Sequence, residues 1–161
     1  MNSGPTLQQG SQGSDVRRVQ RILVMVKLMD WEGIDGIFGP KTKDSVESFQ
    51  QGQGLDVDGI VGPATWGAMP ADPNTPLLKE GSTGAAVSGL QHGLLTYNGP
   101  GTPTDPQGVD GIFGPNTESA VRAYQGDHNV GVDGIVGDRT WWVPAGGAGA
   151  TLASLSGLTT V

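Results

Sequence analysis

The chain contains no cysteine. This excludes a disulfide framework, on which small exported domains often depend, and also a zinc site built on thiolates. Any small domain in this chain must therefore be stabilised by packing alone. Aromatic residues are few, at 6% of 161 residues, whereas glycine (28) and proline (11) are abundant, which predicts short elements joined by many turns.

Basic charge is also scarce. Nine Lys and Arg stand against 16 Asp and Glu, the net charge is -7, and the largest basic cluster is the pair Arg17-Arg18. Because nucleic-acid binding needs a basic surface, nucleic acid is not a predicted partner. The longest apolar stretch, ILVMVKLM, is interrupted by Lys27 and is far shorter than the roughly 20 apolar residues of a membrane span. No membrane span or signal peptide is predicted, so the route of any export stays open.

Internal repetition dominates the rest of the sequence. The phrase Asp-Gly-Ile-Phe/Val-Gly occurs four times, beginning at Asp35, Asp58, Asp110 and Asp133. The stretch from Asp35 to Trp66 recurs 75 positions later, while the stretch that begins at Leu7 recurs 71 positions later, at Leu78. The second copy therefore carries four extra residues, which fit in the Pro- and Gly-rich loop 97–108.

Four segments follow from this alignment. We predict one repeat over residues 1–69 and a second over 77–143, joined by a Pro-containing linker, 70–76. The Gly/Ala/Ser/Thr-rich tail, 144–161, belongs to neither repeat. Its composition favours a disordered terminus over a segment that becomes ordered on a partner.

The pattern within one repeat predicts three helices. The first begins near Ser14, its expected N-cap; the second runs from Pro40 to about Gln50, and the third is short and carries Trp66. Each Asp-Gly is expected to form a tight turn in which Gly has positive φ and the Asp side chain accepts backbone N–H groups. The Ile that follows, with its Phe or Val neighbour, is expected in the core. The predicted fold class is all-α, with two small three-helix domains in tandem.

These motifs resemble the peptidoglycan-binding domain type 1 family, present twice. The resemblance rests on four motifs in fixed order, which in the first copy are Gly10 to Gln20, Asp35 to Thr42, Ser45 to Gln50 and Asp58 to Trp66. It implies a non-catalytic, cofactor-free module that binds bacterial peptidoglycan, through its glycan or its stem peptide, outside the cell or at the cell wall.

Two other functions stay open. The chain could be a structural or adaptor component of a phage particle or a phage-tail-like machine, or the partner of a separate wall hydrolase, docking through residues 144–161. A wall hydrolase with a cryptic site is the third possibility.

A ligand of this chemistry would need hydrogen-bonding groups beside an apolar or aromatic face, in a shallow groove near the Asp-Gly turns. The predicted ligand-binding residues are an Asp, a Gln and a Trp from each repeat: Asp35, Gln50, Trp66, Asp110, Gln125 and Trp141. Both Trp residues have an alternative role in the core. Trp31 and Trp142 have no counterpart in the other repeat and could add exposed stacking surfaces.

No metal or catalytic residue is predicted. The histidines His92 and His128 lack metal-ligand spacing, and neither recurs in the first repeat. The run that begins at Asp56, DVDG, is similar to part of a calcium-binding loop but lacks the required ligands at the first and last positions.

Overall fold

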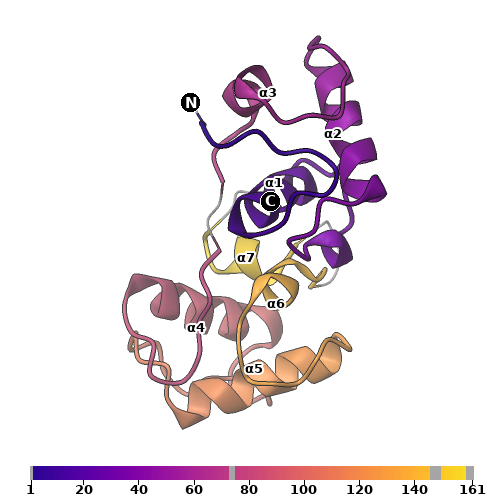
Figure 1. The fold of residues 1–161 in the computed structure, drawn as a ribbon. Coiled ribbons are helices and arrows are strands. Elements are labelled where there is room, and N and C mark those ends of the chain that lie inside the picture. Colours follow the sequence, from indigo (N-terminus) through magenta and orange to yellow (C-terminus); the bar gives the residue numbers. More distant parts are fainter. Residues whose placement is uncertain (1, 73–74, 146–149, 159–161) are drawn as a thin grey trace. The chain divides into compact units, whose positions relative to one another are not determined.

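The computed structural model describes residues 2–72, 75–145 and 150–158. The chain divides into two compact units, Met1–Asn74 and Thr75–Val161, each of which is described by itself. Seven α-helices and one short 3-10 helix make up the regular structure of the described residues, and isolated β-bridges take the place of strands there (Figure 1). The predicted all-α fold in two tandem domains is confirmed.

Unit 1 contains helices α1 (Ser14–Met25), α2 (Pro40–Gly52) and α3 (Pro63–Ala68), with the 3-10 helix η1 (Trp31–Gly33) between α1 and α2. Its core is formed by apolar side chains from all three α-helices, including Val19, Phe49 and Trp66. Pro40 and Pro63 occupy the first position of α2 and α3, where the missing N–H costs nothing.

Unit 2 repeats this order with α4 (Ala85–Asn98), α5 (Pro115–Asp127) and α6 (Asp138–Trp142). Equivalent bridges tie the segment before the first helix to the last turn of each unit: Leu7 pairs with Val61, and Leu78 pairs with Val136. Helix α7 (Leu152–Leu155), yellow in Figure 1, has no equivalent in unit 1.

The tail differs from the prediction of a disordered terminus over residues 150–158. Thr151 caps α7 through a reciprocal pair of hydrogen bonds with Ser154, and α7 packs against α4 and α6. Leu152 and Ala153 are fully buried. Apolar burial and a side-chain cap together stabilise a segment whose composition alone suggested disorder.

Two local expectations were wrong. Ser14 is the first helical residue, and the residue before it is Gly13, with φ of 117° and no side-chain cap. The Ile of the repeated phrase does not enter the core: Ile37 is 52% exposed and Ile112 is 57% exposed, whereas the next residue, Phe38 or Phe113, is buried. Successive side chains in an extended segment point to opposite sides, so only one of the two can be buried.

Candidate functional site

Each Asp-Gly turn is held by a buried glutamine from the preceding helix. In the first turn, Gln20 of α1 donates through Nε2 to Asp35 Oδ1, the Ile37 carbonyl and Thr42 Oγ1, at 3.0, 3.1 and 3.1 Å. Its Oε1 accepts the N–H groups of Asp35 and Gly36, at 3.1 and 2.9 Å. We call this arrangement the glutamine clamp.

The clamp occurs four times with the same partners. Gln50 holds the turn at Asp58, Gln91 holds that at Asp110, and Gln125 holds that at Asp133, always with Gly, Ile and Thr in the equivalent roles. The glycine of each turn has φ between 71° and 78°, a region that a side chain makes costly. The repeated phrase therefore has a structural role: it forms a turn that the glutamine side chain holds by hydrogen bonds.

Four of the six predicted ligand-binding residues lie inside this scaffold. Gln50 and Gln125 are 1% exposed, and their amides are occupied by the clamp. Trp66 and Trp141 are fully buried, and their Nε1 groups donate to the carbonyls of Pro5 and Pro76 at 2.8 and 2.7 Å. Their burial conflicts with the direct ligand contact predicted for these four residues. Their side-chain hydrogen bonds go to the protein itself.

The two remaining predicted residues, Asp35 and Asp110, are exposed. In both, Oδ1 accepts from the clamp amide and from the N–H of the following Ile, at 2.9 to 3.0 Å. The Gln91 amide and the Ile112 N–H lower the pKa of Asp110 because both donate to its charged form. These two turns therefore each present a carboxylate beside an exposed apolar Ile. The structure does not bring Asp35 together with Gln50, which holds a different turn.

The other two tryptophans also depart from expectation. Trp142 is 2% exposed and donates to Thr75 Oγ1 at 3.3 Å, so the stacking surface expected there is absent. Trp31 is half-buried in η1.

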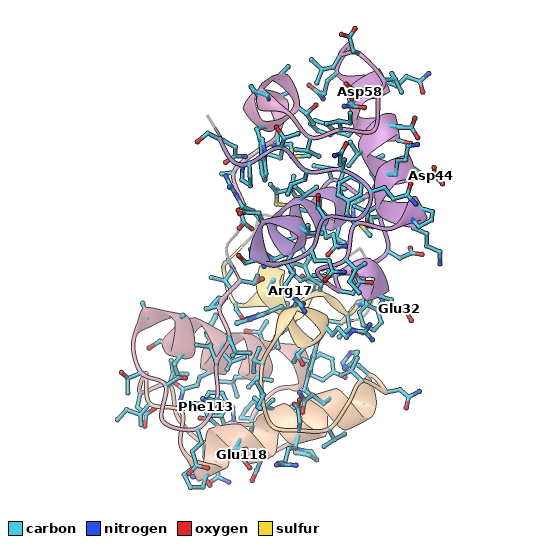
Figure 2. All side chains as sticks on the ribbon, in the orientation of Figure 1. Arg17, Glu32, Asp44, Asp58, Phe113 and Glu118 are labelled. Atoms are coloured by element: carbon cyan, nitrogen blue, oxygen red, sulfur yellow. The ribbon has the colours of Figure 1, made fainter. Side chains whose placement is uncertain are left out.

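An open hollow of about 590 Å³ lies in unit 1 beside the first Asp-Gly turn. Its walls come from the end of α1, η1 and the start of α2, and they carry charge of both signs. Figure 2 labels Glu32 and Asp44, which mark η1 and α2 along this hollow. The side chains that line it include Lys27, Asp30, Asp35, Lys41 and Asp44. Asp35, of the first Asp-Gly turn, is among the residues that line the hollow.

In the described ranges 2–72, 75–145 and 150–158, no group of three or more His, Asp or Glu is arranged to hold a metal ion. His128 Nδ1 lies 2.8 Å from the Tyr124 carbonyl, and its ring packs against that of Tyr124, with centroids 4.1 Å apart. The helices of the same ranges are too short or too polar to cross a membrane.

The sequence analysis predicts only Gln50 and Gln125 as functional residues, and as ligand contacts, so the set of four clamp glutamines is a finding of the structure. The sequence carries a signal for the set: each Asp of the phrase is followed seven positions later by Thr, as in Asp35 and Thr42, and each preceding long helix carries a Gln directly after an apolar or aromatic residue.

With the geometry in place, comparison with known proteins identifies the family. The chain matches the peptidoglycan binding domain family twice, over residues 12–69 and 83–142. The protein belongs to the peptidoglycan binding domain family.

Relatives carry this module beside other domains. The chain is 30% identical over 165 residues to the N-acetylmuramoyl-L-alanine amidase CwlL of Bacillus licheniformis, covering 86% of this chain and 45% of that protein. It is 43% identical over 67 residues to the zinc D-Ala-D-Ala carboxypeptidase of Streptomyces albus G, covering 38% of this chain and 24% of that protein. Among solved structures, the SleB N-terminal domain is 34% identical, with a TM-score of 0.38, over 40% of this chain and 88% of that one. The chain thus spans less than half the length of these two curated relatives.

Proposed function

We propose that this chain binds bacterial peptidoglycan without cleaving it, and acts at the cell wall. The observation that carries the proposal is the match of both repeats to one family of peptidoglycan binding domains, which covers residues 12–69 and 83–142. The relatives named as amidase and carboxypeptidase act on the same polymer, which supports the wall as the place of action.

The clamps explain how so small a module could hold a binding surface. Two clamps per unit fix the Asp-Gly turns with five hydrogen bonds each, all between 2.8 and 3.2 Å. Each turn then presents one carboxylate and an apolar flank, as Asp35 does with Ile37 and Asp110 does with Ile112. A preorganised surface loses little conformational entropy when a polymer docks, which is the main contribution that a rigid scaffold makes to affinity.

The absence of cleavage is part of the proposal. The four buried glutamines and the four exposed turn aspartates all have scaffold partners. The chemistry of the site supports hydrogen bonding and charge contact rather than bond breaking.

The adaptor hypothesis rests on residues 144–161 and requires them to be available to a partner. Residues 146–149 and 159–161 lie outside the described residues, but Leu152 and Ala153 are buried against unit 2. Docking through those side chains would first require α7 to leave α4. This makes wall binding the function we favour.

Sedimentation with insoluble sacculi tests the proposal. Most of the purified chain should pellet with sacculi and stay soluble with chitin particles, and the supernatant should contain no released muropeptide after overnight incubation. Failure to pellet would contradict binding, and released muropeptides would contradict the absence of cleavage.

A further inference from the structure

We propose that the hollow in unit 1 is a subsite for a short peptide that carries both an ammonium and a carboxylate group, and that unit 2 lacks this subsite. Within the proposed wall-binding function, on which this inference rests, the ligand is the stem peptide rather than the glycan.

Four of the charged side chains that line the hollow form no ion pair within the described part of the chain. Lys27 and Lys41, both exposed, form no ion pair with any described residue, and neither do Asp30 and Asp44. Side chains of opposite charge therefore line one hollow without pairing across it. That arrangement suits a ligand that brings both charges itself, because each of its groups meets an opposite charge on the wall.

Local structure directs these side chains to the hollow. The chain leaves α1 through Lys27, which has φ of 66°, and the next residue returns its N–H to the Leu23 carbonyl at 2.9 Å. Lys41 and Asp44 lie three positions apart on α2 and so share one face of the helix. Asp35 adds a carboxylate already oriented by the clamp.

The composition of the walls argues against a sugar. Sugar rings are bound by the flat face of an aromatic side chain, and none of the residues that line the hollow is aromatic. N-acetylated sugars are neutral apart from the lactyl acid, which the stem peptide occupies. A neutral chain would leave four charges at the hollow without partners, whereas a stem peptide with a diamino acid and a free carboxyl end would supply both signs.

Unit 2 has lost the corresponding charges. The counterparts of Lys27, Lys41 and Asp44 at the offsets of the two repeats are Asn98, Asn116 and Ser119, all uncharged. The loop between its first two helices is the one that carries the four extra residues, and it buries Thr104 completely. Among Lys27, Asp35, Lys41 and Asp44, only Asp35 keeps its charge in unit 2, as Asp110.

The double variant Lys41→Asn with Asp44→Ser tests the subsite in the full chain, because it installs the residues that α5 already tolerates at these positions. The matched control, Lys79→Asn with Asp56→Ser, makes the same charge changes at exposed side chains away from the hollow. The probe is a soluble stem tetrapeptide containing diaminopimelate, followed by backbone amide shifts. We expect shifts within residues 27–45, and affinity about tenfold or more weaker in the pocket variant only, with thermal stability unchanged in both.

Three outcomes would overturn the inference: equal loss in the control, equal shifts in unit 2, or a neutral N-acetylglucosamine oligomer displacing the peptide from the hollow. Blocking the amine and carboxyl groups of the tetrapeptide should abolish the shifts. Sedimentation separates the two proposals. If the wild-type chain fails to pellet with sacculi, the proposed function fails; if the wild type pellets and the pocket variant binds tetrapeptide as well as the control, only the subsite fails.

Discussion

The two units share a scaffold and differ in what covers the first helix. In unit 1, Arg18 of α1 lies over the Trp66 ring, with its guanidinium carbon 4.2 Å from the centroid. In unit 2, the equivalent position is Gly89, where an added Cβ would lie 2.8 Å from the Ser156 carbonyl oxygen. One copy uses a charged side chain on this face, and the other accommodates the C-terminal tail.

This difference shows which parts of a duplicated module are constrained. The four clamps are the same because in each the Gln Oε1 accepts the backbone N–H groups of the turn Asp and Gly, which need a partner when they are buried. The helix faces and the loop after the first helix have diverged: unit 1 has an open, charged hollow, and unit 2 has α7 and a longer loop. Scaffold is retained in both copies, whereas the proposed recognition surface is found in one.

Loss of a clamp glutamine should lower the free energy of unfolding more than any other change considered, and by the same amount in both units. Gln50→Leu and Gln125→Leu keep much of the side-chain volume but leave two backbone N–H groups without an acceptor and remove the hydrogen bonds that Nε2 donates. We expect each to destabilise its own unit by about 3 to 5 kcal/mol. Hydrogen exchange resolved by peptide reports the two units separately.

Gln51→Leu, at an exposed position beside Gln50, is the control and should leave stability nearly unchanged. A stable Gln50→Leu variant that no longer binds sacculi would restore Gln50 as a ligand contact. A large effect in only one unit would show that the two scaffolds are not equivalent.

Changes in the contact between α7 and α4 should cause the next largest loss of stability, confined to unit 2. Leu152→Ala removes a fully buried side chain and should cost about 2 to 5 kcal/mol. Gly93→Ala should also destabilise unit 2, because the new Cβ would lie 3.0 Å from the Ser156 N and closer still to its Oγ. Chemical denaturation of the full chain measures both.

Gly126→Ala is the matched control, since it lies in α5 with nothing within 4 Å of the added Cβ. Alanine has the higher helix propensity, so this variant should be stabilised by up to about 1 kcal/mol. If Gly93→Ala behaves like Gly126→Ala, α7 does not pack on α4 in solution.

The sequence was sufficient for the fold and insufficient for the site, for physical reasons. Gly-Pro helix starts, Asp-Gly turns and apolar spacing are local signals, and they correctly placed α2 and α3. The partner of the first turn in each unit is not local: Gln20 lies 15 residues from Asp35, and Gln91 lies 19 residues from Asp110. Whether Ile37 or Phe38 faces the core, and whether Leu152 is buried, likewise depend on packing that the chain pattern does not specify.

Removal of the Arg18 guanidinium, which lies over the Trp66 ring, should cause a moderate loss of stability in unit 1 alone. Arg18→Ala removes the guanidinium and the side-chain stem, and we expect about 0.5 to 2 kcal/mol of destabilisation by denaturant titration. Arg18→Met keeps an apolar stem over the ring, so it should recover part of this loss. Full recovery by Met would indicate that packing alone, and not the charge, stabilises this face.

The smallest effect concerns the clamp carboxylates at low pH. The Ile60 N–H and the Gln50 amide lower the pKa of Asp58, and the Gln91 amide and the Ile112 N–H lower that of Asp110, from an ordinary value of 3.8. A carboxyl with a lowered folded-state pKa contributes stability above its unfolded pKa and loses it as the pH falls through the folded value.

Asp110→Asn should therefore be less stable than the wild type at neutral pH, with the difference shrinking as the pH falls below 3.8. The same should hold for Asp58→Asn in unit 1. Asp56→Asn, which removes an exposed carboxylate outside the clamps, is the control when melting temperatures are compared between pH of about 7 and about 2.5. A difference that grows on acidification would show that the clamp favours the protonated carboxyl, opposite to the hydrogen bonds described here.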